Sequence, residues 1–167
     1  MILGPERDVL LCRWQKELPE AKVSALDISK EALSLARENA NILEVKNVDF
    51  IEGDILNKSF NSQLSTFNLI VSNPPYVREC EKANMEPNVL DYDPHTALFV
   101  SDEDPLIFYR AIAEFALTHL APNGALYFEI NQYLSRESCD LLISLGYKNV
   151  TLKEDINGNA RMIKATL

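Results

Sequence analysis

Glycine and cysteine are scarce in this sequence of 167 residues, which has five glycines and three cysteines. Cys12, Cys80 and Cys139 are odd in number, lie far apart and form no CxxC pair. This spacing supports neither a disulfide framework nor a zinc site, so we expect three reduced thiols and no metal. Gly4 is the only glycine before Gly53. The start of the chain therefore has no evident glycine-rich turn of the kind that lets backbone approach a ligand closely.

Long apolar runs and excess basic charge are also missing. No apolar run reaches the roughly 18 residues of a membrane span, and Met1 to Lys16 lacks the order of a signal peptide, so we expect a cytoplasmic protein without a membrane partner. Asp and Glu number 25 against 16 Lys and Arg, which gives a net charge of -9. Because phosphate binding relies on Lys and Arg, nucleic acid is disfavoured as the direct substrate.

Strand and helix patterns alternate along most of the chain, whose length is that of a single domain. This alternation predicts a doubly wound, mostly parallel α/β sheet. The last two strands are joined through a short turn over residues 155–159 and predict an antiparallel edge. The expected strands cover residues 22–27, 48–52, 67–72, 125–130, 149–154 and 162–167, and the expected helices cover residues 9–18, 30–41, 106–120 and 135–145. Residues 122–124 are expected to turn the chain into the strand at 125–130, and Ser135 is expected to cap a helix that ends at Gly146.

The apolar run over residues 67–72 stops at Asn73-Pro74-Pro75-Tyr76. Proline cannot donate a ladder hydrogen bond, so the strand must end here, and Pro74 holds Asn73 in an extended conformation. The carboxamide oxygen of Asn73 and the carbonyl of Pro74 are two acceptors that could hold both hydrogens of a planar NH2 group, with the Tyr76 ring against its plane. This arrangement indicates N-methylation. The alternative is a simple loop after a core strand.

Two aspartates follow other predicted strands. In a doubly wound sheet ligands bind across the carboxyl ends of the strands, so Asp27, Asp54 and Asn73 should line one crevice. Asp27 stands where an acidic residue accepts the hydroxyls of a ribose, and Asp54 could accept from an adenine amino group with Ile55 packed on the ring. Taken alone, Asp27 is more typical of a helix cap or dipole partner, and Asp54 after Gly53 is a common turn pair.

The segments ALDIS, GDI, VSNPPYV, DYDPHTALF, LIFYRAI, FEINQ and DINGNARMIKA occur in this order. Together they resemble the HemK/PrmC family of class I, S-adenosylmethionine-dependent methyltransferases, which have a Rossmann-like fold. The resemblance runs from about Leu18 to the end of the chain. It implies methylation of the glutamine side-chain amide in the GGQ motif of peptide chain release factors, gripped by Asn73 to Tyr76. DNA adenine methyltransferases share NPPY, but are not expected to share the Asp93–Leu98 or Asn157–Arg161 stretches.

The same resemblance also implies parts that residues 1–17 do not match. A family member carries a helical N-terminal recognition domain and a first strand that leads into a D-x-G-x-G-x-G turn. We therefore interpret the chain as one methyltransferase-like domain, with residues 1–17 atypical and residues 18–167 family-like. We hypothesise that residues 4–15 are a frameshifted remnant of the glycine-rich turn, which the other reading frame of the gene would test.

Two further expectations follow from the atypical start. The first strand should be degraded or missing, which would leave a gap in the sheet and favour self-association through it. The leading function is an N-methyltransferase that acts on release factors with S-adenosylmethionine. The alternatives are an inactive or cofactor-impaired remnant that serves as a binding module and, more weakly, a nucleic-acid adenine N-methyltransferase.

Overall fold

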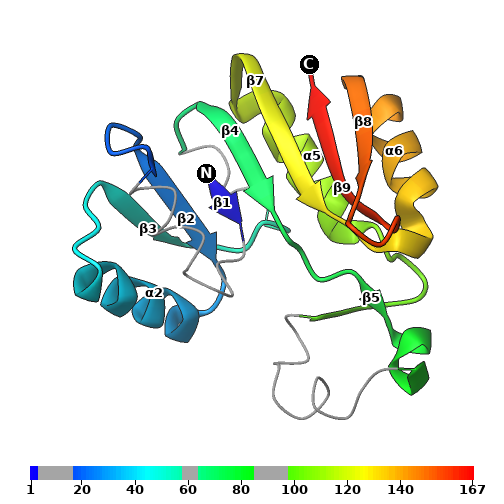
Figure 1. Ribbon diagram of the computed structural model, residues 1–167, viewed down its shortest axis with the longest axis horizontal. Coiled ribbons are helices and arrows are strands. Elements are labelled where there is room, and N and C mark those ends of the chain that lie inside the picture. Colours follow the sequence, from blue (N-terminus) through cyan, green and yellow to red (C-terminus); the bar gives the residue numbers. More distant parts are fainter. Residues whose placement is uncertain (4–16, 58–63, 85–97) are drawn as a thin grey trace.

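A computed structural model describes residues 1–3, 17–57, 64–84 and 98–167. Its main feature is a seven-stranded sheet of order β3-β2-β1-β4-β7-β9-β8 (Figure 1). The strands are β1 (Ile2–Leu3), β2 (Val23–Asp27), β3 (Val48–Glu52), β4 (Phe67–Ser72), β7 (Leu120–Glu129), β8 (Lys148–Glu154) and β9 (Ala160–Thr166). The helices are α2 (Lys30–Ile42), α5 (Ile107–His119) and α6 (Ser135–Ser144), with short 3-10 turns η2 (Glu79–Asn84) and η3 (Gln132–Leu134).

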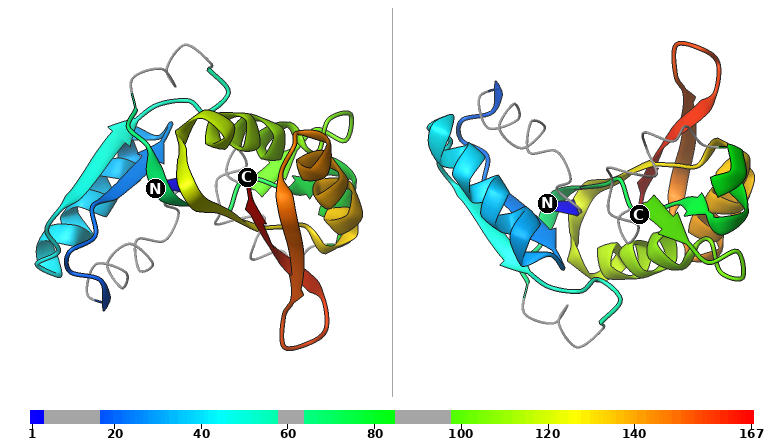
Figure 2. Two further views of the ribbon diagram at one scale, coloured as in Figure 1. Left: turned by 90° about the horizontal axis from the view of Figure 1, so that it is seen from above. Right: turned by 90° about the horizontal axis from the view of Figure 1, so that it is seen from below.

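The sheet is doubly wound, as the alternation of strands and helices predicts. Strands β3, β2, β1, β4 and β7 are parallel to their neighbours, whereas β9 runs antiparallel to β7 and β8. Figure 2 shows α2 on one face of the sheet and α5 on the other. Because the chain moves outward in opposite directions from β1, right-handed crossovers place the two helices on opposite faces. The carboxyl ends of the parallel strands share one edge (Figure 1).

Apolar side chains from both halves of the sheet form the core. Ile70 of β4, Leu126 of β7 and Ile163 of β9 are fully buried, and Tyr109 and Ile112 of α5 pack in the same cluster. Helix α2 begins at Ser29, whose side chain accepts a hydrogen bond from the Ala32 N–H, and it buries Leu33, Ala36 and Ala40 as its periodicity predicts. These elements carry the segment after each strand to the common edge.

The first strand of the sheet is degraded rather than missing. Strand β1 has two residues and lies between β2 and β4, where the expected first strand belongs. The Ser72 hydroxyl donates a buried hydrogen bond of 3.1 Å to the Leu3 carbonyl, and the Val71 N–H donates to the Met1 carbonyl at 2.9 Å. The centre of the sheet is therefore bridged at this row, and self-association through a gap stays a prediction.

Two local expectations were wrong. The turn expected at residues 122–124 lies inside β7, where a register shift relative to β4 absorbs the extra residues and Asn123 takes a φ of 65°. Ser135 does not cap α6, because Leu134 holds the cap position without a side-chain hydrogen bond. Asn131, four residues before Ser135, caps η3 instead by accepting from the Tyr133 N–H. The end of α6 at Gly146, with a φ of 96°, is as expected.

Several expectations fall outside the described residues. These are the helix over residues 9–18, except for its last residues, the frameshift hypothesis for residues 4–15, and the Asp93–Leu98 stretch, of which only Leu98 is described. Cys12 also lies outside, while Cys80 and Cys139 are free thiols. Within the described ranges, no helix is long and apolar enough to cross a membrane.

Replacing Ser72 by alanine tests the bridge between β1 and β4. The Leu3 carbonyl would lose a buried donor, so we expect Ser72→Ala to lower the free energy of unfolding by about 1–2 kcal/mol in urea denaturation. Ser144→Ala is the matched control, because the Ser144 hydroxyl donates to the Leu141 carbonyl at an exposed site. The control should change stability by less than about 0.5 kcal/mol. Equal effects of both substitutions would contradict a structural role for the Ser72 bond.

Candidate functional site

The candidate site lies at the carboxyl edge of the parallel strands. Leu3 is level with Leu26 in β2 and with Ser72 in β4, so Asp27 and Asn73 each stand one residue beyond that row. Strand β1 separates them, which puts their backbones about 10 Å apart at the usual strand spacing. Asp27 pairs with Glu52, and the Gly53 N–H donates to the Asp27 carbonyl at 3.0 Å. Asp54 follows directly, so all three predicted residues lie along one edge.

The Asn73-Pro74-Pro75-Tyr76 segment leaves the sheet at this edge. Asn73 is exposed, and none of the described residues forms a hydrogen bond with its carboxamide. Pro74 is buried and Pro75 is half-buried, so the prolines anchor the segment by packing. An exposed amide next to a buried proline is free to meet a ligand. The exposure of the Asn73 amide is compatible with a ligand-binding role.

Tyr76 is held more firmly than the sequence alone indicates. Its hydroxyl donates to Oε1 of Glu129 at 3.0 Å, and Nδ2 of Asn131 donates to its carbonyl oxygen at 3.0 Å. Burial, and then the nearby negative charge of Glu129, raise the pKa of Tyr76 to about 12. The phenol is thus neutral at physiological pH and can keep donating this hydrogen bond.

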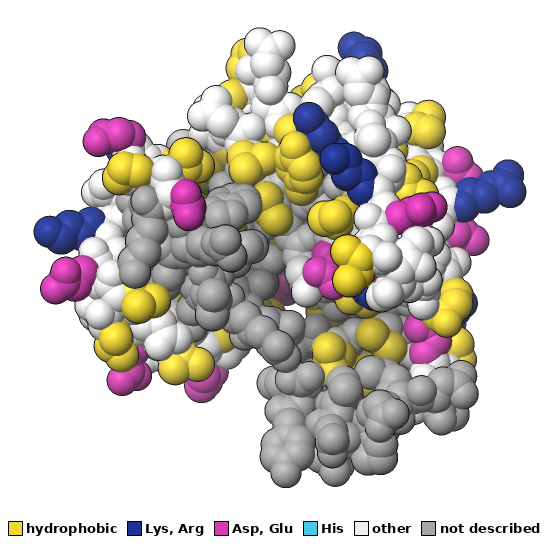
Figure 3. Space-filling model, in the orientation of Figure 1, with side chains coloured by type: hydrophobic (Ala, Val, Ile, Leu, Met, Phe, Trp, Pro, Cys, Tyr) yellow, Lys and Arg dark blue, Asp and Glu magenta, His cyan; other side chains and the backbone are white. Residues whose placement is uncertain are grey.

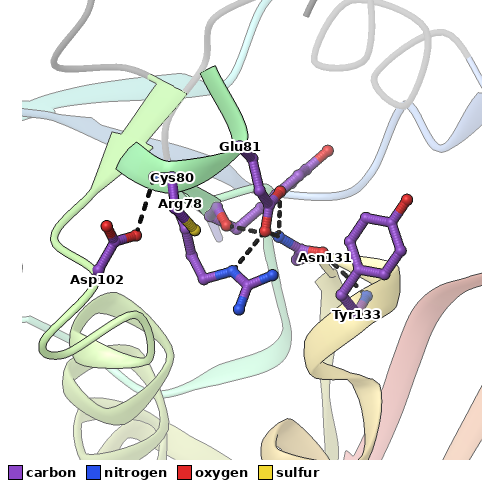
Figure 4. A network of polar contacts seen from close by, with 7 residues as sticks. Arg78, Cys80, Glu81, Asp102, Asn131 and Tyr133 are labelled. Atoms are coloured by element: carbon purple, nitrogen blue, oxygen red, sulfur yellow. Dashed lines mark hydrogen bonds and ion pairs between the residues drawn. The ribbon is translucent and has the colours of Figure 1, made fainter. Parts of the chain in front are cut away.

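Asn131 links the motif to the segment that follows it. The side chain is 4% exposed, and its Nδ2 also donates to both carboxylate oxygens of Glu81 at 3.2 and 3.1 Å. Glu81 pairs with Arg78 in turn, and Oδ1 of Asn131 accepts from the Tyr133 N–H (Figure 4). Arg78 belongs to β5 (Val77–Arg78), which pairs with β6 (Phe99–Val100). A single buried amide therefore joins the segment after β7 to Tyr76 and to η2.

A second polar chain reaches the site from the β8–β9 hairpin. Nη1 of Arg161 lies 3.9 Å from Oε1 of Glu129, and its Nε lies 3.8 Å from Oδ2 of Asp155. Hydrogen bonds from the Asn159 and Asn157 N–H groups lower the pKa of Asp155. The ionised carboxylate therefore both shapes the hairpin turn and holds Arg161.

Asp27 and Asp54 occupy the other half of the edge. Oδ1 of Asp27 accepts from the Ser29 N–H at 2.7 Å. Burial raises the pKa of Asp27, and the Ser29 and Ile28 N–H groups partly offset this rise. Oδ1 of Asp54 accepts from the Leu56 N–H at 2.8 Å. Asp54 thus has the turn role that was its alternative, whereas α2 is capped by Ser29 and Asp27 forms a local turn just before that cap. Ile55 packs at the margin of the main core.

The carboxylate acceptors on this edge are of the kind that ribose hydroxyls and an adenine amino group require. A half-buried carboxylate that accepts only from backbone N–H groups has lone pairs left for hydroxyl donors, as Asp27 does. Asp54 uses one oxygen in its turn and is itself half-buried. Within the described residues no group of three or more His, Cys, Asp or Glu could hold a metal ion.

Sequence reasoning missed the residues that organise this site. Glu129, Asn131 and Arg161 stand in two of the recognised segments, but no role was predicted for them. The available signal was the topology, because β7 is the next parallel strand beside β4 and its carboxyl end must reach the same edge. The alternation of buried Phe128 and Ile130 with polar neighbours marks these side chains as part of that edge.

The described part of the face shown in Figure 3 carries side chains of both charges. Acidic side chains are present on it as well as Lys and Arg side chains. A groove that binds duplex nucleic acid needs clustered positive charge. The described part of this face therefore favours a partner other than nucleic acid.

The comparisons with known proteins agree with this geometry. The family model described as "Methyltransferase domain" matches residues 9–129. A release factor glutamine methyltransferase of Flavobacterium psychrophilum is 54% identical over 149 residues, covering 89% of this chain and 51% of the relative. One of Bacteroides thetaiotaomicron is 47% identical over 163 residues, covering 98% of this chain and 58% of the relative. The chain thus spans about half the length of these relatives.

Solved structures share the fold. A methyltransferase from Pyrococcus furiosus superposes with a TM-score of 0.69 at 20% identity, covering 99% of this chain and 73% of that one. A ribosomal protein L11 methylase from Lactobacillus delbrueckii gives a TM-score of 0.66 at 17% identity, covering 99% of this chain and 67% of that one. These likenesses confirm the Rossmann-like α/β fold with an antiparallel edge.

Asn131 and Asn73 should differ sharply in their contribution to stability. Asn131→Ala removes the donor to the Tyr76 carbonyl and the acceptor of the Tyr133 N–H, so we expect it to lower the free energy of unfolding by about 2–3 kcal/mol. Asn73→Ala, at an exposed position, should change it by less than about 0.5 kcal/mol. Urea denaturation followed by circular dichroism measures both. A large loss in Asn73→Ala would show that its amide is structural.

Proposed function

We propose that this chain, which belongs to the HemK/PrmC family of release factor glutamine methyltransferases, transfers a methyl group to the glutamine side-chain amide of a peptide chain release factor. The family depends on S-adenosylmethionine. The relatives named above are longer, so activity, substrate and partner of this chain are our inference. We place the reaction in the cytoplasm, where release factors act.

One observation supports the proposal most strongly. Asn73 is exposed and without a partner among the described residues at the carboxyl edge of the sheet, while Pro74 beside it is buried and Tyr76 is fixed at both its hydroxyl and its carbonyl. A rigid segment that presents an open carboxamide is suited to hold a planar amide. In the absence of a ligand, water satisfies this exposed carboxamide, so its hydrogen-bonding capacity is available to a substrate amide.

The residues of this chain would act by binding and orientation. The Asn73 carboxamide oxygen and the Pro74 carbonyl would accept the two N–H bonds of the substrate amide, which directs its nitrogen and increases the electron density there. The Tyr76 ring would pack against the amide plane. Asp27 would accept ribose hydroxyls, and Asp54 with Ile55 would contact the adenine ring. S-adenosylmethionine, when bound, supplies the electrophilic methyl group.

A second candidate function is a binding module that holds cofactor weakly. Leu3 ends β1 at the ligand edge, and Gly4 is the only glycine between that strand and β2. A side chain at the other positions of this connection would hinder close backbone contact with a ligand. The two candidates share the fold and the NPPY segment, and they differ in cofactor affinity and turnover. Methylation of nucleic-acid adenine is disfavoured by the net charge of -9.

Asn73→Ala should abolish methyl transfer while the fold stays intact. Loss of an acceptor that acts on the transition state costs about 3–4 kcal/mol, so kcat/KM should fall roughly 100- to 1000-fold. Transfer of labelled methyl groups to a purified release factor measures the rate. Asn68→Ala is the control, since Asn68 is an exposed asparagine on β4, the strand that Asn73 follows. Activity of Asn73→Ala close to that of the unmodified chain would remove the amide-holding role.

Cofactor affinity of the 167-residue chain should be weak. Two missing hydrogen bonds from a glycine turn to a charged group cost about 3–6 kcal/mol, which moves a micromolar site toward the millimolar range. Isothermal titration calorimetry with S-adenosylmethionine measures the dissociation constant, and Asp27→Ala should remove the remaining heat. A micromolar constant would show that residues 4–16 build a working loop, and it would favour the enzyme over the binding module.

A further inference from the structure

The hydroxyl of Tyr76 is the end of a chain of contacts that crosses three segments of the protein. It donates to Oε1 of Glu129 at 3.0 Å. The same oxygen faces Nη1 of Arg161 at 3.9 Å, and Nε of Arg161 faces Asp155 at 3.8 Å. The chain connects the NPPY segment with the end of β7 and with the β8–β9 hairpin.

The backbone sets each member of this chain in place. Glu129 is the last residue of β7 and pairs with Met162 of β9, next to Arg161. The Ile130 N–H donates to the Arg161 carbonyl at 2.9 Å, so the two side chains start from adjacent, hydrogen-bonded positions. At the far end, Oδ1 of Asp155 accepts from the N–H groups of Asn157 and Asn159 at 2.8 and 3.0 Å.

A contribution to stability does not account for this arrangement. The side chains of Glu129 and Arg161 are 40% and 37% exposed, and exposed ion pairs of this length contribute little to the free energy of folding. The contacts instead restrict the orientation of the Tyr76 side chain. A tyrosine hydroxyl that donates to a carboxylate held from the other side has one preferred position, and its ring is fixed with it.

The groups around the Tyr76 hydroxyl belong to the same chain of contacts. Glu129 and Arg161 face it directly, and Tyr109 contacts the same neighbourhood through a hydrogen bond of 3.2 Å from its hydroxyl to the Glu129 carbonyl. The Tyr109 contact fixes the Glu129 backbone, whereas Arg161 and Asp155 fix its carboxylate. The position of Glu129 is therefore determined at both its main chain and its side chain.

We propose that Glu129 is a positioning residue, and that Arg161 and Asp155 hold its carboxylate so that the Tyr76 ring stays in position to pack against a substrate amide. Glu129 acts through Tyr76 and touches no substrate. The inference rests on the proposed function for its effect on methyl transfer. Its structural part concerns only the orientation of Tyr76, which can be measured without turnover.

The kinetic experiment compares Glu129→Ala, Glu129→Gln, Arg161→Ala and Arg161→Lys in methyl transfer to a purified release factor. We expect Glu129→Ala to lower kcat roughly 10-fold, with the KM for S-adenosylmethionine within about twofold of that of the unmodified chain. Glu129→Gln keeps an acceptor for the Tyr76 hydroxyl and should recover part of the loss, as should Arg161→Lys relative to Arg161→Ala. Because the two residues act through one contact, Glu129→Ala/Arg161→Ala should be no slower than Glu129→Ala.

The control is Glu154→Gln, which removes the same charge from an exposed position on the same hairpin. It should retain the kcat of the unmodified chain. Thermal unfolding of each variant separates loss of rate from loss of fold. An unchanged kcat in folded Glu129→Ala, or a defect confined to the KM for the cofactor, would overturn the proposal.

Nuclear magnetic resonance of the chain labelled with 13C at the tyrosine ζ carbon gives a readout without turnover. Tyr76→Phe assigns the signal. Glu129→Ala should shift this signal and lower the Tyr76 pKa from about 12, because the negative charge and the hydrogen-bond acceptor beside the phenol are removed. Glu154→Gln should leave the signal unchanged.

The two readouts distinguish the two ideas. If the unmodified chain transfers no methyl group, the proposed function fails for this chain, and the Tyr76 signal alone decides the positioning role. A signal that does not move in Glu129→Ala would overturn that role, whatever the activity. A signal that moves while kcat does not would likewise overturn it, because the ring position would then not matter to the reaction.

Discussion

The absence of two successive backbone N–H groups at Pro74 and Pro75 is the constraint on which the site depends. A chain that cannot donate at two adjacent positions cannot continue in a parallel ladder, so β4 ends at Ser72 and the segment leaves the sheet. Backbone hydrogen bonds then cannot hold the exit. Packing of Pro74 and side chains from the neighbouring strand must do so, and Asn131 and Glu129 supply them.

The order of the strands in the sheet determines which side chains can hold the segment that leaves the sheet after β4. Because β7 lies directly beside β4 and parallel to it, the last residue of β7 and the residues after it reach the same edge. Strand β9 is antiparallel to β7, so the chain begins β9 at the edge where β7 ends. Arg161 therefore stands beside Glu129, although 32 positions separate them in the printed sequence. The antiparallel ending of the sheet brings the hairpin to the site.

The sequence predicted strands β2, β3, β4, β7, β8 and β9 and helices α2, α5 and α6, because each follows a local pattern. The row of Asp27, Asp54 and Asn73 then follows from the parallel order of their strands. Residues 48–52 form a strand with the expected bounds, and Leu33, Ala36 and Ala40 are buried on α2 as their spacing indicates. The turn expected at residues 122–124 failed since the choice between a turn and a bulge depends on pairing with β4, which local sequence does not contain. The roles of Glu129, Asn131 and Arg161 escaped prediction for the same reason, because each depends on a partner in another strand.

The site contains one asparagine whose amide is fully bonded and one whose amide is exposed, and a stability argument alone would not predict this difference. Asn131 is buried, uses both ends of its amide and holds the Tyr76 carbonyl, whereas Asn73, three residues before Tyr76, is exposed with no partner among the described residues. Two carboxamides so close in the fold differ because one organises the segment and the other is left free. A binding group must keep its hydrogen-bonding capacity for the ligand, so its neighbours must provide the rigidity that it cannot gain from internal bonds. On this argument, the contacts from Asp155 through Arg161 and Glu129 to Tyr76 provide the rigidity that the exposed amide of Asn73 cannot gain from internal bonds.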